Sequence, residues 1–184
     1  MSLILTSERL LLRPLSQSDM DIVVEMRTNP DVMKFFGGAE TEEQIALNMR
    51  KYTRRCAEGR IGAWCVTDRS TEEKLGMAIL LPLANGEDEM WDLVVGDDLP
   101  DCEIQIGFML KRSSWDKGFA TEASRRLLRF AFEDILLDEL VATTHLDNTT
   151  SKRVLEKSGL VPELIRRRPG FRVTRQQWEE RLPG

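Results

Sequence analysis

The stretch from Trp115 to Ala123 has the residue types and spacing of an anion-binding loop. It follows an apolar, strand-like run at residues 105–110 and precedes a run of helix-forming residues at 123–133. The first turn of a helix leaves backbone N–H groups unpaired at an electropositive end. Gly118 has no side chain to hold a ligand away from them, so the loop fits a phosphate cradle. It equally fits a helix that needs a flexible beginning, and the loop alone leaves both interpretations open.

The segments around this loop predict an α/β (α+β) single domain. Apolar and alternating patterns predict strands at residues 9–15, 61–67, 75–83, 103–110 and 140–145. Helical periodicity predicts helices at residues 20–27, 45–56, 123–133 and 152–158, the first two preceded by capping boxes. A polar link joins the second and third strands, which predicts an antiparallel hairpin. The order strand, loop, helix, strand over residues 103–145 favours parallel pairing of its two strands.

Two further segments have weaker patterns. Residues 85–102 form an acidic excursion, and residues 90–95 within it have the composition of a strand. Near the C-terminus, residues 164–168 and 171–175 predict a hairpin that turns at Pro169 and Gly170.

Composition narrows the class of protein. The length of 184 residues fits one domain over residues 1–184, and the net charge of −5 argues against direct nucleic-acid binding. Cys56, Cys65 and Cys102 lie far apart without a CxxC pair, which predicts a reducing, cytoplasmic location. With His145 as the one histidine, we expect no metal site. No apolar run reaches the length needed to span a membrane, so no membrane partner is expected.

The chain resembles the GNAT superfamily of acyl-CoA N-acyltransferases, and within it the branch of ribosomal-protein N-alpha-acetyltransferases. The segments that carry the resemblance are TSERLLLRP (6–14), NPDVM (29–33), WDKGFATEA (115–123), NTTS (148–151) with LEKSGL (155–160), and TRQQW (174–178). They span nearly the whole chain in the family's order. The resemblance implies the GNAT fold, a mixed and mostly antiparallel sheet flanked by helices.

The resemblance also implies that acetyl-CoA is the cosubstrate. Backbone N–H groups from Lys117 to Thr121 would hold its pyrophosphate, which agrees with the anion cradle, and the pantetheine would pair with the end of the preceding strand. Trp115 stands where the family usually has Gln or Arg. The implied cofactor-binding residues are Phe108, Met109, Leu110, Trp115, Lys117, Gly118, Phe119, Ala120, Thr121, Asn148 and Ser151.

Acetyl transfer to an amine requires deprotonation of the amine and, for the departing thiolate, a proton. Many relatives have an acidic residue at the position of Gln105, which cannot act as a base, so Glu103 on the same strand face is the candidate base, acting through water. Many relatives have a Tyr at the position of Leu155, so Ser151 is the candidate acid, and Asn148 would hydrogen-bond the pantetheine or a water. Each has a structural alternative, an exposed carboxylate for Glu103 and helix capping for the other two.

Two residues offer other mechanisms. His145 lies at the end of the strand beside this site, and it is either a general base or a structural residue. Cys102 next to Glu103 would allow an acyl-cysteine intermediate, although direct attack by the amine is the simpler route.

The acceptor is expected to be a primary amine, either a protein N-terminus or a small molecule. The acidic excursion is either a solvated loop or an electronegative rim that attracts cationic amines. The arginines of the last hairpin would bind a substrate carboxylate or pair with that excursion across a homodimer. Phe35, Phe36, Trp64 and Trp91 would line an acceptor slot or belong to the core. The alternative function is a non-catalytic acyl-CoA-binding or sensing module.

Overall fold

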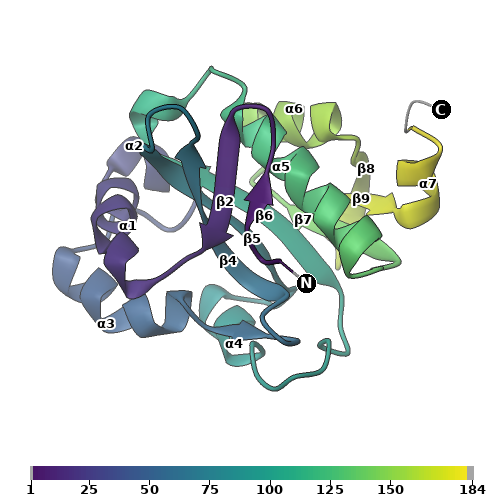
Figure 1. The fold of residues 1–184 in the computed structure, drawn as a ribbon, viewed down its shortest axis with the longest axis horizontal. Coiled ribbons are helices and arrows are strands. Elements are labelled where there is room, and N and C mark those ends of the chain that lie inside the picture. Colours follow the sequence, from purple (N-terminus) through teal and green to yellow (C-terminus); the bar gives the residue numbers. More distant parts are fainter. Residues whose placement is uncertain (1, 182–184) are drawn as a thin grey trace.

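The computed structural model describes residues 2–181 as a twisted central sheet with helices on both faces (Figure 1). Met1 and residues 182–184 of the predicted domain lie outside the described part. The strands are β1 (Leu5–Thr6), β2 (Leu10–Pro14), β3 (Arg55–Cys56), β4 (Ile61–Asp68), β5 (Lys74–Pro82), β6 (Ile104–Leu110), β7 (Glu139–Thr143), β8 (Val161–Ile165) and β9 (Arg168–Thr174). Their order across the sheet is β1-β2-β4-β5-β6-β7-β9-β8, with β3 paired to β4.

Neighbouring strands of this sheet are antiparallel except β6 and β7, which are parallel. The predicted β4–β5 hairpin and the predicted parallel pair are therefore confirmed. So is the predicted fold class, because the sheet is mixed, mostly antiparallel and flanked by helices.

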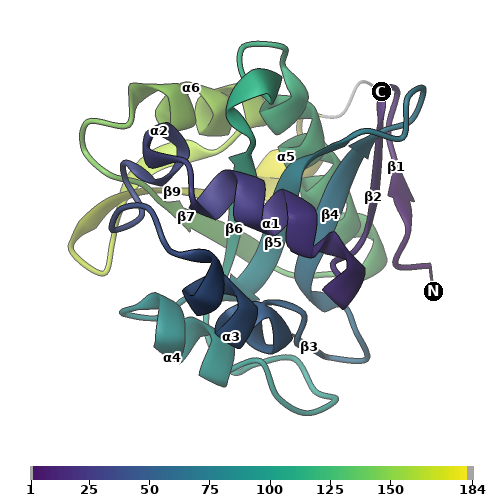
Figure 2. The same ribbon diagram turned by 90° about the vertical axis from the view of Figure 1, so that its left-hand side faces the viewer.

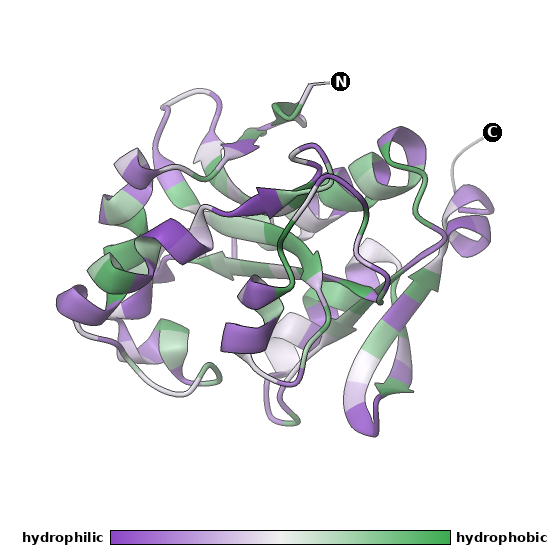
Figure 3. Ribbon diagram, turned by 90° about the horizontal axis from the view of Figure 1, so that it is seen from below, coloured by the Kyte–Doolittle hydropathy of each residue, from purple (hydrophilic) through white to green (hydrophobic). Residues whose placement is uncertain are grey.

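The helices are α1 (Met20–Arg27), α2 (Pro30–Met33), α3 (Glu42–Tyr52), α4 (Glu87–Asp92), α5 (Phe119–Arg129), α6 (Thr149–Ser158) and α7 (Arg175–Glu179). Helices α1 to α3 lie in front of the sheet in Figure 2, and α5 lies behind it. Seen from below, the strands are largely hydrophobic and the helices carry hydrophilic outer surfaces (Figure 3). This distribution is expected for amphipathic helices, which bury their apolar face against a sheet and expose their polar face.

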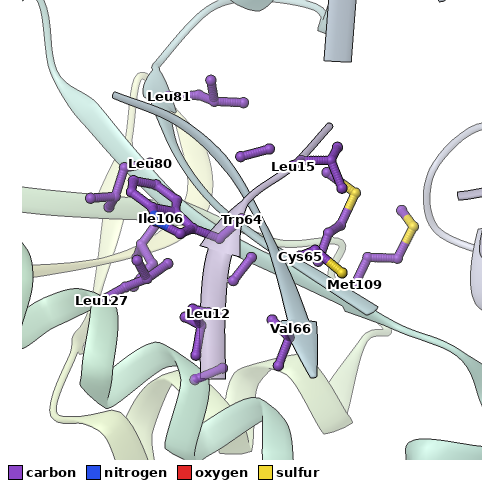
Figure 4. Packing of buried hydrophobic residues seen from close by; sticks show 14 of the residues in the cluster. Leu12, Leu15, Trp64, Cys65, Val66, Leu80, Leu81, Ile106, Met109 and Leu127 are labelled. Atoms are coloured by element: carbon purple, nitrogen blue, oxygen red, sulfur yellow. The ribbon is translucent and has the colours of Figure 1, made fainter. Parts of the chain in front are cut away.

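The main core fills both faces of the sheet, with residues of α1 and α3 on one side and of α5 on the other. Trp64 on β4 is fully buried, its ring meets Phe130 edge-on, and its indole N–H donates to the Leu3 carbonyl at 2.9 Å. Figure 4 shows part of the cluster around it, including Leu80 and Ile106. Trp64 is thus a core residue, which is the structural alternative given for it above.

Three predicted segments were wrong. The helix predicted at residues 45–56 ends at Tyr52, and Cys56 lies in β3 instead. Residues 90–95 do not form a strand, because Met90 and Trp91 belong to helix α4 and turn their side chains toward the core. The last hairpin turns at Arg166 and Arg167, both with positive φ (47° and 65°), as a two-residue hairpin turn requires.

Pro169 and Gly170, the predicted turn, lie inside β9 instead. Gly170 is needed for packing there, because a Cβ would come within 2.7 Å of the Ala142 carbonyl oxygen on β7. The sequence pattern predicts a turn at Gly170, but this glycine instead allows β9 to pack closely against β7.

A buried carboxylate ties α1 to the sheet. Asp19, just before α1, is fully buried and accepts two hydrogen bonds from the Arg13 guanidinium, at 2.7 and 2.6 Å. It also accepts from the Ser16 backbone N–H at 3.0 Å and pairs with Lys74 at 3.1 Å. Burial alone would raise the pKa of Asp19, but these hydrogen bonds hold that pKa well below its usual range. The ion pairs therefore join β2, β5 and the beginning of α1.

We expect Asp19→Asn to lower the free energy of unfolding at pH 7 by about 3 kcal/mol, because it removes the buried carboxylate with which the half-buried Arg13 and Lys74 pair. A carboxylate with a lowered folded-state pKa stabilises the protein above its unfolded-state pKa of about 4, and this stability is lost as the pH falls below that value. Denaturant unfolding across pH should thus show a shallower acid-side loss for Asp19→Asn than for the native chain. Asp21→Asn is the matched control, since Asp21 is exposed and its one ion pair within residues 2–181 is with Lys74. Equal effects of the two substitutions would contradict this account.

Candidate active site

The site is organised by the divergence of β6 and β7. These parallel strands share one register pair, Gln105 with Val141, and then separate toward their carboxyl ends. Each is held on its other side, β6 by β5 along its whole length and β7 by β9. The separation opens a gap in the middle of the sheet.

A cavity of about 550 Å³ occupies this gap. Gln105, Gly107, Phe108 and Met109 line it from β6, and it is bounded on the other side by the residues that end β7. Lining residues also come from both layers of helices: Asn148, Ser151 and Leu155 at α6, and Arg27, Phe35, Phe36, Met90 and Trp91 on the α1 side. The cavity, hereafter the cleft, is therefore bounded from both faces of the sheet.

The loop after β6 keeps an anion-binding geometry. Gly118 is the N-cap residue of α5 in the left-handed conformation (φ 79°), and Asp116 also has positive φ (61°). No side chain caps this helix. Within residues 2–181, no protein acceptor takes the backbone N–H groups of Gly118, Phe119, Ala120 and Thr121. These donors point out of an eleven-residue helix whose dipole favours a negative charge.

The loop is held in place from the opposite end of the chain. The Arg9 guanidinium donates to the Lys117 carbonyl at 3.0 Å and to Glu122 at 2.7 Å, and it lies over the Phe119 ring. Glu122 also accepts from the Arg9 backbone N–H at 2.8 Å and from the Ser7 hydroxyl at 2.7 Å. Burial alone would raise the pKa of Glu122, but these donors lower that pKa, so the carboxylate stays charged. This Arg9–Glu122 clamp fixes the carbonyl before Gly118 and hence the direction of the loop.

The residues expected to bind the cosubstrate occupy two places. Phe108, Met109, Asn148 and Ser151 line the cleft, while the Trp115–Thr121 stretch follows the end of β6. The Trp115 indole donates to the Leu110 carbonyl at 2.9 Å, which closes the last carbonyl of β6. Lys117 and Gly118 are exposed, and Ala120 and Thr121 are half-buried. Phe119 is buried, so it can offer a ligand only its backbone.

Asn148 is the N-cap of α6, as predicted, and its side-chain oxygen accepts from the Ser151 N–H at 3.1 Å. The Ser151 hydroxyl has no protein partner in the described part of the chain, and it lines the cleft. Capping therefore uses one lone pair of Asn148 and leaves the Ser151 hydroxyl available to a ligand.

Glu103 lies apart from these residues. Its carboxylate accepts from Arg172 at 2.9 Å and from Arg166 at 3.3 Å, and it borders a separate cavity of about 300 Å³. Arg172 also pairs with Glu139 and Glu163; burial alone would lower the pKa of Arg172, but these carboxylates raise it. Two guanidinium groups thus compete for the lone pairs of the candidate base, and the base assignment stays a prediction.

The remaining candidates have defined partners. The Gln105 amide donates to the Pro82 carbonyl at 3.2 Å and contacts the Met90 sulfur. Cys102 lines the smaller cavity beside Glu103, and burial raises the pKa of its thiol.

His145 lines the cleft and stacks on Phe35, with ring centroids 5.1 Å apart. Its Nδ1 accepts the Asp147 backbone N–H at 3.2 Å, so the neutral ring carries its proton on Nε2. The Nδ1 lone pair is then used within the turn, and together with the stack on Phe35 this supports the structural interpretation of His145 over the general-base one.

The acidic excursion is largely compensated where it approaches α3. Asp88 pairs with Lys51, and Asp92 lies 3.5 Å from Arg54. Trp91 is buried against Tyr52 of α3, so the segment is packed rather than projecting. Its negative charge is therefore smaller at this surface than the sequence suggests.

A family model described as "Acetyltransferase (GNAT) domain" matches residues 9–161, which is most of the chain. The chain belongs to the GNAT acetyltransferase family. It is accordingly an acyltransferase enzyme with N-acetyltransferase relatives. The match supports the GNAT family as a whole and does not distinguish the branch of ribosomal-protein N-alpha-acetyltransferases within it.

Known proteins similar to this one share its fold over nearly its whole length. FsC-acetyl coenzyme A-N(2)-transacetylase of Aspergillus fumigatus is 24% identical over 189 residues, covering 95% of this chain and 77% of that protein. A GNAT family acetyltransferase from Bacillus anthracis has a TM-score of 0.74 at 22% identity, covering 94% of this chain and 99% of that one. A spermidine N-acetyltransferase from Vibrio cholerae, solved with CoA and spermine, has a TM-score of 0.69 at 15% identity, covering 94% and 99%.

Within residues 2–181, no three His, Cys, Asp or Glu side chains are grouped so that they would hold a metal ion. In the same range, no helix combines the length and apolar character that crossing a membrane requires.

The clamp was missed from the sequence. Arg9 and Glu122 both lie inside segments that carry the family resemblance, but 113 positions separate them, and only the fold pairs them. Of the aromatic residues considered for an acceptor slot, Phe35, Phe36 and Trp91 line the cleft and Trp64 does not, whereas Thr144 lines it without having been considered.

We expect Arg9→Gln to weaken acetyl-CoA binding about threefold to tenfold, because the loop carbonyl loses its donor and the N–H groups lose their fixed direction. Isothermal titration calorimetry measures this directly. Arg129→Gln is the control, since it removes the same charge from the far end of α5, where Arg129 pairs with Glu133. Equal affinities for both variants would show that the clamp does not position the loop.

Proposed function

We propose that this protein transfers the acetyl group of acetyl-CoA to a primary amine by direct attack of the amine. The observation that carries the proposal is the uncapped N-terminus of α5 at the end of β6, next to strands that part. A pyrophosphate would use the free N–H groups from Lys117 to Thr121. An amide-rich pantetheine would pair with the β6 edge at Phe108 and Met109, which β7 leaves open.

The fit of CoA rests on the residues present. At Gly118 a Cβ would meet only the Arg9 guanidinium, at 3.4 Å, so the loop surface is open in front of the backbone donors. Arg9 uses its other nitrogens for Glu122 and Lys117, and this nitrogen faces the loop. A diphosphate is therefore met by backbone N–H groups and a guanidinium, both of which favour negative charge.

Three residues are assigned roles at the reacting group. We assign Ser151 as the proton donor to the departing thiolate, since its hydroxyl is unpaired and lines the cleft. Asn148 holds the pantetheine or a water with the lone pair that capping leaves free. Glu103 is kept as a base that acts through water, because an α-amino group with a pKa of about 8 needs only weak assistance.

The acceptor is a small molecule or a protein N-terminus, as in the branch that the sequence resembles. A cleft of about 550 Å³ with walls on both faces of the sheet supports the small molecule, because this volume is in the range of small-ligand pockets. A cytoplasmic location is part of the proposal and rests on three free cysteines. The proposal also includes a homodimer in which arginines of the last hairpin pair with the acidic excursion of the other copy. Arg166 and Arg172 already pair with Glu103 within one chain.

The direct test is acetyl-CoA turnover with a panel of amines, followed by mass spectrometry of the product. Acetylation of at least one amine is expected. Tight acetyl-CoA binding without turnover on peptides, amino acids, polyamines or aryl amines would favour a sensing module instead.

We expect Ser151→Ala to lower kcat at least about tenfold while acetyl-CoA affinity changes less than about threefold, because the hydroxyl is needed only when the thiolate departs. Steady-state kinetics with calorimetry separates the two effects. Thr150→Ala, at an exposed position in the same helical turn, should leave kcat unchanged. An unaltered kcat in Ser151→Ala would remove Ser151 from the mechanism.

A further inference from the structure

Part of the cleft, where residues of the α1 side meet those after β7 and on β9, forms a pocket of aromatic side chains and hydrogen-bond donors. We call it the acceptor pocket and define it by Phe35, Phe36, Trp91, Thr144 and Arg168, all of which line the cleft. The stack of Phe35 on His145 joins the segment after α2 to the segment after β7. This contact closes part of the pocket and gives it an apolar, flat wall.

Two buried polar atoms of this pocket have no partner. Neither the Trp91 indole nitrogen nor the Thr144 hydroxyl oxygen has a hydrogen-bond partner within residues 2–181. A buried polar group without a partner is unfavourable and in native proteins usually has an explanation. An indole N–H can only donate, so its partner must be a hydrogen-bond acceptor. A bound substrate that brings oxygen atoms would supply it.

The charge of the acceptor pocket also favours a substrate that brings oxygen atoms. Arg168 lines the cleft, and no ion pair joins it to a carboxylate of the described chain, whereas Arg166 and Arg172 both pair with Glu103. Among the described side chains that line the cleft, none is a carboxylate. A polyamine would therefore find no opposite charge here, while a carboxylate would find a guanidinium that binds it in a bidentate manner.

We infer that the acceptor pocket binds a carboxylate of the acceptor, so that the substrate is a primary amine that also carries a carboxylate. The inference rests on the proposed acetyl transfer and names its substrate class. Arg168 pairs with the carboxylate, the Trp91 N–H and the Thr144 hydroxyl hydrogen-bond its oxygens or a neighbouring carbonyl, and Phe35 packs on the apolar body of the substrate. The amine nitrogen then faces the parted strands.

The test compares amines that differ only by a carboxylate: L-phenylalanine with phenethylamine, and para-(aminomethyl)benzoate with benzylamine. For each pair, the ratio of kcat/KM is measured in the native protein, in Arg168→Gln and in Arg167→Gln. Arg167 is the control because it is the exposed neighbour in the same turn and does not line the cleft. Comparing variants cancels the different basicity of the two amines in a pair.

We expect Arg168→Gln to reduce the preference for the carboxylated amine about tenfold or more in at least one pair, and Arg167→Gln to leave it within about twofold. The loss should lie in KM for the amine, with KM for acetyl-CoA unchanged. Equal ratios in the three proteins would overturn the inference, as would efficient acetylation of spermidine with neither carboxylated amine accepted.

A second variant tests the indole without removing a charge. Trp91→Phe keeps an aromatic ring and removes the N–H, and it should raise KM for the carboxylated amine about threefold to tenfold. Trp178→Phe is the matched control, because the Trp178 indole nitrogen is also buried without a partner but lies outside the cleft. Equal KM values in the two variants would remove the indole from substrate recognition.

Calorimetry on the complex with CoA separates this inference from the proposed function. If no amine is acetylated although acetyl-CoA binds, acetyl transfer fails. Binding of para-(aminomethyl)benzoate that depends on Arg168 would then still support the pocket, and failure of both carboxylated amines to bind would overturn it.

Discussion

Backbone N–H and C=O groups in the middle of a sheet must find partners, and parallel strands that separate lose the partners they would give each other. This constraint acts where β6 and β7 diverge after the pair formed by Gln105 and Val141. The two strands stay in place because each has an antiparallel neighbour on its outer side. The Trp115 indole satisfies the last carbonyl of β6, but the edge before it remains open to an extended, amide-rich ligand. The cleft, the cosubstrate and the acceptor pocket all depend on that opening.

The two helices that begin near the opening differ in how they satisfy their first N–H groups. Helix α6 is capped by Asn148, so its first turn is largely neutralised by its own sequence. Helix α5 begins at Gly118 with no cap, and the Arg9–Glu122 clamp orients its loop. Of the two, α5 therefore has the donors for an anion. This difference is the reason for placing the pyrophosphate of CoA at Gly118 and its acetyl end at Asn148.

Local patterns predicted most of the fold, and errors occurred where packing decides the local structure. The capping box at Thr41 and the N-cap at Asn148 formed as expected, because short-range hydrogen bonds determine them. Pro169 and Gly170 misled the turn prediction, because Gly170 serves an approach to β7 that the sequence does not reveal. The cofactor loop was predictable, since it is one contiguous segment. Phe35 and Trp91 were considered for an acceptor slot, but their grouping with Arg168 was not predictable, since the three come from separate segments that only the fold brings together.

The central claim is that the open β6 edge and the uncapped α5 hold CoA together. A crystal structure of the protein with CoA tests it most directly. The account predicts pyrophosphate oxygens within hydrogen-bond distance of the backbone N–H groups of residues 117–121, and pantetheine amides paired with the backbone at Phe108 and Met109. A pyrophosphate bound away from Gly118, or a pantetheine that leaves the β6 edge unpaired, would contradict it.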